Sequence, residues 1–361
     1  MRRKNADFAQ AHGLASVSQT LGPGNLELLL LGFERAGGEP GSPADPVLKA
    51  RRQELRGLSG LSYTVERRGG EGRPDLRLSA LGSFGMSRAR FSDLDAEIGT
   101  GGGALTENRS LRAFGRVAAS VGLTRFLQTS ALATLTYDGY SPQDALARVP
   151  MPDSGRTSLA AGAEAELHAK LLGRRFQLRP SLRVEHSAAN LHSERFGAVV
   201  QTDNQSTLAT YRLGAALELL PDLTLSASAS SGARTPSMLE LFGDGALLRG
   251  NTALRPEHSR SFDLGLSDVS CVGDFSGSFE LRVFDLAIED QVLFVRNSFS
   301  QLLPLNLASS HVRGLEAGAR AQLGAWFLNA AATMLDTAGK PGKHLPNRPR
   351  ATFFVQPGFE A

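Results

Sequence analysis

Short segments of alternating apolar and polar residues recur along the whole chain, and they constrain its fold more than any other feature. Residues 176–184, 211–219 and 315–323 place apolar side chains on every second position, with polar or small residues between most of them. Alternate residues of a β-strand point to opposite faces of the sheet. Each segment therefore predicts a strand with one apolar and one polar face. Its length, about nine residues, is what a tilted strand needs to cross a bilayer core.

The polar faces of these strands carry charges of both signs, including Arg179, Arg183, Glu185, Glu316 and Arg320. A soluble β-sandwich needs dry inner faces, so such strands are difficult to place in one. A water-filled barrel lumen tolerates charged side chains. The alternation therefore favours an all-β fold, a transmembrane antiparallel β-barrel whose lumen these five residues face. A soluble β-sandwich is the alternative.

Composition and motifs argue against several other classes of protein. No run of about eighteen apolar residues occurs, so a helical membrane span is not expected. Lys and Arg exceed Asp and Glu by only three charges, which is too few to indicate a nucleic-acid partner. Cys271 is the single cysteine, which rules out an internal disulfide and a cysteine-based metal site. Phosphate-loop and nucleophile-elbow motifs are also missing. The sequence predicts no enzyme, no metal site and no cofactor.

The connections between the predicted strands fall into two groups. Short turns are expected at residues 171–174, 220–222 and 272–274. The other connections are long and rich in Gly, Pro and charge, and they cover residues 36–57, 90–109, 138–156 and 190–206. Short turns on one side and long loops on the other are typical of outer-membrane barrels. We count roughly fifteen to seventeen strands, in one unit that spans residues 1–361.

Residues 223–266 carry the most specific signal in the chain. Apolar side chains occupy the odd positions of residues 223–229, and a second alternation follows at residues 262–266. Pro236 cannot donate to a β-ladder and biases the residue before it toward extended geometry, so the first strand is expected to end there. The residues between the two alternations include Gly, Pro and Asn, which are ordinary turn residues.

The order of residues in this stretch resembles a hairpin of the TonB-dependent outer-membrane receptors. In that family a strand ends in Arg, a small residue and Pro, and a Leu-x-Glu-Leu-Phe-Gly segment follows. Gly-Asn-x-x-Leu-x-Pro-Glu-x-Ser then leads into the next strand. Matching residues here, including those of three later motifs, are Arg234, Pro236, Leu239, Glu240, Leu241, Phe242, Gly243, Gly250, Asn251, Leu254, Pro256, Glu257, Ser259, Asp290, Asn306, Gly314, Glu316, Pro346 and Pro349. We expect them to shape turns and strands rather than to contact a ligand.

The resemblance implies an outer-membrane receptor and transporter of the siderophore or cobalamin type. An intact member would bind a scarce ligand through its long extracellular loops and a plug domain, and would admit it with energy transmitted by TonB. The four long loops are then the expected contributors to ligand contact. The five lumen-facing charged residues are expected to contact the plug or one another. The implied partners are TonB, through a plug domain, an unidentified small molecule and outer-membrane lipid.

The sequence departs from that family in its extent. Its basic first residues are not followed by the apolar core of a secretory signal, and the TonB box and plug domain have no counterpart. The resemblance therefore implies a barrel segment, truncated at both ends, with fewer strands than the family-typical 22. Unpaired strand edges are costly in hydrocarbon, so we expect the isolated chain not to insert as a working transporter. A passive outer-membrane channel and a non-functional receptor remnant are the alternatives.

Overall fold

The computed structural model describes residues 4–41, 46–69, 75–98, 102–146, 151–195, 198–243, 248–296, 301–339 and 348–359. In these ranges the chain forms fifteen strands and one short helix. The elements are β1 (Phe8–Leu21), β2 (Gly24–Gly38), β3 (Arg51–Arg67), β4 (Leu76–Asp93), β5 (Ala104–Thr124), β6 (Leu127–Asp144), β7 (Ser154–Leu171), β8 (Arg174–Arg195), β9 (Ala198–Leu220), β10 (Leu223–Arg234), α1 (Met238–Phe242), β11 (Glu257–Val272), β12 (Phe275–Arg296), β13 (Leu302–Leu323), β14 (Trp326–Gly339) and β15 (Ala351–Phe359). No helix in the described ranges has the length and apolar composition of a membrane span.

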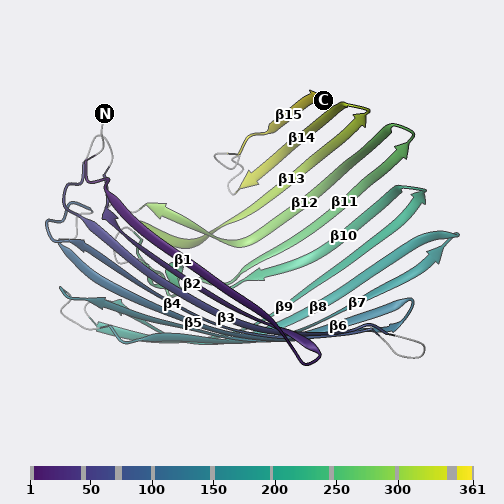
Figure 1. The fold of residues 1–361 in the computed structure, drawn as a ribbon. Helices are drawn as coiled ribbons and strands as arrows, with labels where there is room; N and C mark the ends of the chain where they lie inside the picture. Colours follow the sequence, from purple (N-terminus) through teal and green to yellow (C-terminus); the bar gives the residue numbers. More distant parts are fainter. Residues whose placement is uncertain are drawn as a thin grey trace.

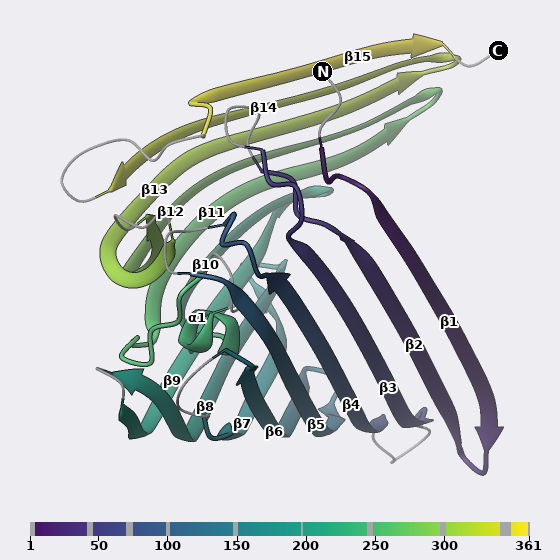
Figure 2. The same cartoon turned by 90° about the vertical axis from the view of Figure 1, so that its left-hand side faces the viewer.

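All fifteen strands belong to one antiparallel sheet in which each strand pairs with its neighbours in sequence, so β1 and β15 form the two edges. The sheet curves into an open trough, with β1 (purple) and β15 (yellow) on opposite rims (Figure 1, Figure 2). A chain of consecutive hairpins is the arrangement of an up-and-down barrel. The all-β prediction and the expected strand number are confirmed.

The two faces of the sheet follow the alternation of the sequence. On β8, Leu182 and Val184 are exposed, whereas Ser181 and Arg183, on the opposite face, are less exposed. Directly opposite residues share a face, and the register places Tyr211 beside Leu182. The helix α1 lies inside the trough (Figure 2). Its last residue, Phe242, stacks on Tyr140, and the register places Tyr140 on the same face as Ser181. The polar face is therefore the concave one, and the apolar face is convex.

This arrangement exposes much more surface than a compact protein does. The solvent-accessible surface is 23226 Å², whereas a compact monomer of 38.4 kDa exposes about 14,000 Å². On the convex face, Leu135, Leu159, Leu182 and Phe262 are each more than half exposed. The apolar side of the sheet has no partner within the described chain, as expected of a barrel wall that faces lipid.

The strands are mostly longer than the nine residues predicted, and the loops are correspondingly shorter. Residues 190–206, predicted as a long loop, lie almost entirely in β8 and β9, where Asn190 pairs with Asp203 and Leu191 with Thr202. That prediction was wrong because polarity was taken as a loop signal. Strand pairing uses the backbone, so a hairpin in register continues above the apolar belt without apolar side chains. In the other three predicted loops the strands extend and leave connections of residues 39–50, 94–103 and 145–153. Residues 42–45, 99–101 and 147–150 of these connections lie outside the described residues.

The predicted short turns are confirmed. β7 ends at Leu171 and β8 begins at Arg174. Between them, Leu172 and Gly173 have φ angles of 53° and 78°, as a two-residue hairpin turn of the I′ type requires. The β9–β10 and β11–β12 connections also contain two residues each. Because consecutive strands are antiparallel, these turns share one end of the trough, and most of the longer connections lie at the other end.

Candidate functional site

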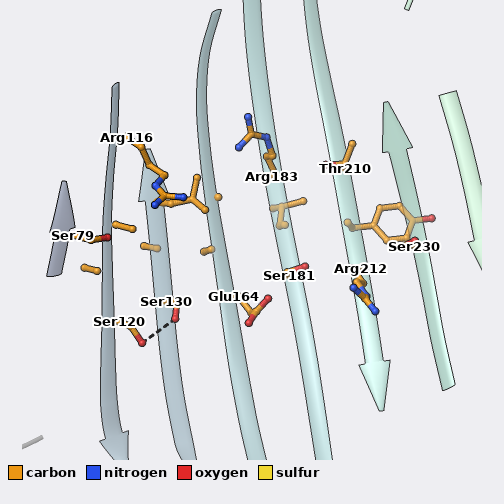
Figure 3. Close-up of a pocket in the computed structure, with 18 of the residues that line it drawn as sticks. Ser79, Arg116, Ser120, Ser130, Glu164, Ser181, Arg183, Thr210, Arg212 and Ser230 are labelled. Carbon is orange, nitrogen blue, oxygen red and sulfur yellow. Dashed lines mark hydrogen bonds between the residues drawn. The ribbon is translucent and has the colours of Figure 1, made fainter. Parts of the chain in front are cut away.

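The concave face holds a pocket of polar and small apolar residues near the middle of the sheet (Figure 3). Its volume is about 690 Å³, and residues of β4 to β10 line it. The labelled polar residues of the lining are Ser79, Arg116, Ser120, Ser130, Glu164, Ser181, Arg183, Thr210, Arg212 and Ser230. Arg212 lies directly opposite Ser181 and Ser230, so strand pairing brings these residues together from distant parts of the sequence.

Arginine dominates the charge of this pocket. Arg183 forms an ion pair with Glu185 at 3.0 Å, and the Ser130 hydroxyl donates to Ser120 at 3.1 Å (Figure 3). No ion pair joins Arg116 or Arg212 to any other residue that the structure describes. Each guanidinium carries five N–H donors, so both side chains present donors to whatever occupies the trough.

Charged residues predicted to face the lumen lie on the concave face. Arg179 pairs with Glu166 at 2.8 Å, and Arg183 pairs with Glu185 as described above, so part of this set is neutralised within the wall. Glu316 lies opposite Arg282 in the register, and Arg320 lies opposite Ser278. The wall thus contains ion pairs between its own residues, and it also contains arginines, such as Arg116 and Arg212, that form no ion pair with another residue that the structure describes.

The connection between β10 and β11 covers residues 235–256, and its described parts, 235–243 and 248–256, fold into the trough instead of extending away from it (Figure 2). It begins with α1, whose N-cap is Ser237. The backbone N–H of Glu240 donates to the Ser237 hydroxyl at 3.3 Å, and the Ser237 N–H donates to the Glu240 carboxylate at 2.7 Å. This reciprocal capping box satisfies two donors that a helix start leaves unpaired.

Arg234, the last residue of β10, ties the two ends of this connection together. Its guanidinium binds Glu240 at 2.9 Å and Glu257, the first residue of β11, at 2.8 Å. Burial raises the pKa of the Glu240 carboxyl, but hydrogen bonds from Arg234 and Ser237 outweigh burial and leave the pKa below its ordinary value. The carboxylate is therefore held in its charged form inside the trough.

Contacts with the opposite wall hold the connection in place. The Phe242 ring stacks on Tyr140 of β6 with 4.6 Å between ring centroids. The Tyr140 hydroxyl donates to the Gly243 carbonyl at 3.2 Å. Arg156 of β7 donates to the Pro236 carbonyl at 2.6 Å. Backbone carbonyls of the connection thus accept hydrogen bonds from strand residues 103 and 80 positions earlier in the sequence.

A small hydrophobic core lies beneath these polar contacts. Leu241 and Leu254 of the connection pack with Leu191 of β8 and Val292 of β12, and each is less than a tenth exposed. Burying large aliphatic side chains stabilises a contact by about 1.5–3 kcal/mol each. The connection therefore has its own core, and a second buried cluster of Val47, Ala50 and Phe91 lies at the β2–β3 connection.

Two glycines of the connection occupy positions that no other residue fits. Gly243 has a φ of 78°, and a Cβ there would overlap the Leu248 carbonyl oxygen. A Cβ on Gly250 would overlap the backbone of Phe242. Positive φ and close backbone approach are the two conditions under which glycine is required. Both residues are needed to close the connection on itself.

Two asparagine amides complete the network. The Asn251 side chain donates to the Pro304 carbonyl at 2.9 Å. The Asn306 side chain accepts from the Arg255 N–H at 2.9 Å and donates to the Asp290 carbonyl at 2.6 Å. Asp290 has a φ of 53° and lies where the register between β12 and β13 shifts. The amides therefore link the connection to a bulge in the neighbouring strands.

The structure brings together most of the residues singled out by the sequence. Those between Arg234 and Glu257, with Asp290 and Asn306, form or border the β10–β11 connection. Gly314 and Glu316 lie farther along β13. Pro349 lies just before β15, and Pro346 lies outside the described residues. The contacts given above join these residues to the chain itself, and a purely structural role for them stays a prediction.

Sequence reasoning missed the residues of the opposite wall. Tyr140 and Arg156 were placed in a loop and Leu191 in another, but all three are strand residues. Asp138, which pairs with Arg156 at 3.0 Å, was missed for the same reason. A usable signal was present, because Thr134, Thr136, Asp138 and Tyr140 continue one period-two series along β6.

A second contact joins two of the predicted loops at the same end of the trough. The Glu97 carboxylate accepts from the backbone N–H groups of Leu48 at 3.0 Å, Lys49 at 2.6 Å and Ala50 at 3.0 Å. The hydrogen bond from Lys49, helped by those from Leu48 and Ala50, outweighs desolvation and lowers the pKa of Glu97. The half-buried Glu97 carboxylate thus holds the β2–β3 connection to the β4–β5 connection, together with the ion pair between Lys49 and Asp95 at 2.6 Å.

Comparison with known proteins identifies similar folds and sequences. Residues 44–359 match the family model described as TonB dependent receptor-like, beta-barrel. The vitamin B12 transporter BtuB of Photobacterium profundum is 26% identical over 146 residues, which cover 40% of this chain and 24% of that protein. This chain therefore aligns with about a quarter of that relative's length.

Solved structures resemble the fold over nearly the whole chain. The copper transporter OprC matches with a TM-score of 0.74 and 15% identity, covering 98% of this chain and 58% of OprC. The ferric yersiniabactin uptake receptor FyuA from Yersinia pestis matches with a TM-score of 0.66 and 13% identity, covering 96% of this chain and 55% of FyuA. At these identities the likeness concerns the fold alone, and the chain spans less than two thirds of either structure.

Proposed function

Because the chain belongs to the TonB-dependent receptor β-barrel family, we propose that it forms part of the wall of an importer that takes up a scarce ligand with energy from TonB. The family consists of outer-membrane receptors and transporters, and this chain is an outer-membrane protein. Transport of a particular ligand, and its coupling to TonB, are the proposed part. The observation that carries the proposal is the contrast between an apolar convex face and a polar, arginine-rich concave face.

The concave wall is suited to contact with a domain or ligand inside the trough. Arg116 and Arg212 have no ion-pair partner in the described chain, and both line the pocket on the concave face (Figure 3). A wall that only lined water would gain little from unpaired arginines. We assign these two side chains, with Glu316 and Arg320, to contact with a plug domain.

The proposed ligand is a metal chelate or cobalamin. The sequence match to a vitamin B12 transporter and the fold match to a ferric yersiniabactin receptor support this class. The connections of residues 39–50, 94–103 and 145–153, at the long-connection end, are the proposed ligand-contacting segments. The hydrogen bonds and ion pairs that anchor residues 235–256 have a different proposed role, which is to stabilise the barrel wall below these ligand-contacting segments.

Uptake by the cell that encodes this protein tests the proposal. Deleting the gene should abolish high-affinity uptake of one labelled ligand among cobalamin, ferric siderophores and copper, and deleting TonB should have the same effect. Uptake that rises in proportion to external concentration and does not depend on TonB would instead indicate a passive channel.

A matched pair of variants tests the concave wall. Arg212→Gln removes one charge from the pocket, whereas Arg260→Gln removes one from the convex face. The proposal predicts slower uptake for Arg212→Gln and normal uptake for Arg260→Gln. Equal behaviour of the two variants would contradict the assignment of Arg212.

A further inference from the structure

A group of arginines lies on the outside of the sheet, near the long-connection end of β4 and β5. Arg88, Arg90 and Arg109 bind the same carboxylate, that of Glu107, at 2.5, 2.8 and 2.8 Å. The three arginine side chains are 46–55% exposed, whereas the Glu107 side chain is 11% exposed. Three cations surround one carboxylate, so this arginine group carries two positive charges in excess.

The register places the arginine group on the convex face, directly above the apolar belt. Arg88 lies opposite Leu55 and Arg109, and the preceding convex residue, Met86, lies opposite Leu111. Along β4 the convex residues are apolar or small from Leu78 to Met86, and arginine replaces them at the next two convex positions. In outer-membrane barrels an apolar band about 25 Å tall ends where the lipid headgroups begin. The arginine group therefore lies at headgroup level.

An apolar groove of about 500 Å³ adjoins the arginine group. Its apolar lining on the convex face comes from Leu55, Met86, Leu111, Tyr137 and Gly139. Arg88 and Arg109 lie beside them, and Ser141 and Asp153 also border the groove. The absence of a side chain at Gly139 makes room in the groove, since a Cβ there would lie 3.3 Å from the Tyr137 ring. An apolar groove with arginines at its edge is complementary to an amphiphile that has an acyl chain and an anionic head.

The positive charge of the arginine group exceeds what Glu107 neutralises, which favours binding of a second anion. Arg88 lies directly opposite Arg109 in the register, and like charges in that position destabilise a strand pair. Glu107 already accepts five hydrogen bonds with its two oxygens. Fifteen N–H donors belong to three guanidinium groups, and the bonds to Glu107 use five of them. Guanidinium groups bind phosphate in a bidentate manner.

We propose that the arginine group binds the phosphate of a lipid in the surrounding leaflet, with an acyl chain of that lipid in the adjoining groove. The bound lipid would neutralise the excess charge and fill the surface left open at Gly139. This site faces away from the concave wall, so it is separate from the proposed import path and its test does not depend on uptake.

Lipid binding to the whole chain, purified in a non-ionic detergent, tests this site. Phosphatidic acid carries an exposed phosphate, and phosphatidylcholine with the same acyl chains has a shielded one. Bound lipid is counted by mass spectrometry of the intact complex. The unsubstituted chain should prefer phosphatidic acid by about tenfold, the ratio expected from one charge-assisted hydrogen bond. Equal retention of the two lipids would overturn the proposal without requiring any variant.

A matched pair of double variants locates the site. Arg88→Gln with Arg109→Gln should remove the preference, whereas Arg260→Gln with Arg313→Gln, which removes the same charge from the convex face elsewhere, should keep it. An equal loss of the preference for phosphatidic acid in both double variants would show that the lipid is attracted to the positive charge of the protein in general, and would overturn the proposal. An excess of inorganic phosphate should not displace the lipid, since it lacks an acyl chain. Complete displacement would indicate a free-phosphate site instead and would also overturn the proposal.

Discussion

The convex and concave faces of this sheet are built from the same strands but are stabilised in different ways. The convex face presents apolar side chains that touch little else in the chain, such as Leu182, which is 55% exposed. The convex ion pairs lie above this apolar belt, whereas the concave face carries the anchored β10–β11 connection with a small core around Leu241. The difference teaches that one surface is completed by its surroundings, while the other is completed largely by the chain itself.

The largest expected effect on stability comes from placing a charged side chain on each face in turn, at two adjacent positions of β8. Leu182→Arg puts a charge on the lipid-facing side near mid-strand and should destabilise the inserted protein by about 2–4 kcal/mol. Ser181→Arg adds the same side chain to the concave face and should cost less than about 1 kcal/mol. The measurement is the fraction of the chain that is folded in outer membranes. Equal losses for both variants would show that the faces do not differ.

The next effect concerns the core of the concave face. Leu241→Ala removes a buried side chain and should destabilise the β10–β11 connection by about 2–3 kcal/mol. Leu239→Ala, two residues earlier and 52% exposed, should cost less than about 0.5 kcal/mol. Hydrogen exchange of the α1 amides measures both. A similar increase in exchange for the two variants would mean that the connection has no core.

A smaller effect is expected from one hydroxyl group. Tyr140→Phe keeps the stack on Phe242 but removes the hydrogen bond to the Gly243 carbonyl, which should cost about 1 kcal/mol. Tyr137→Phe, on the convex face, is the control. The hydrogen exchange of the α1 amides measures both variants. An exchange rate in Tyr140→Phe equal to that of the unsubstituted chain would show that the hydroxyl contributes nothing to the anchoring.

The smallest effect is a dependence on pH at the β2–β3 connection. The folded pKa of Glu97 lies below its ordinary value of 4.5. The stabilisation it provides is therefore complete above that ordinary value and is lost as pH falls through the lowered one. A spin label at Leu48, in a chain with Cys271→Ser, should become more mobile on acidification. In Glu97→Gln the mobility should not change with pH, and a transition that persists there would assign the effect to another group.

The sequence predicted the fold well because the alternation is a local property of each strand. Leu182 and Ser181 were assigned to opposite faces from period alone, and the two-residue turn at Leu172 and Gly173 was predicted from the residues around it. Strand ends were predicted less well, since polarity rises above the apolar belt before pairing ends. Residues 190–206 show this most clearly.

Less of the candidate site could be predicted, because it depends on contacts between distant residues. The resemblance singled out Glu240, Gly243 and Gly250, and the structure supplies physical reasons for each. Tyr140 and Arg156 contact the connection only after several intervening strands have curved around the trough. No local pattern reports such curvature, so the opposite wall of the site was not predicted.

The most direct test of this account is which face of β8 contacts lipid. In a Cys271→Ser background, single cysteines at residues 179–185 can be exposed in turn to a water-soluble charged thiol reagent and, once fluorescently labelled, to a quencher carried in the lipid. We predict that odd positions react with the water-soluble reagent and that labels at even positions are quenched from the lipid. A loss of alternation, or its reversal, would contradict the assignment of the convex face to the membrane.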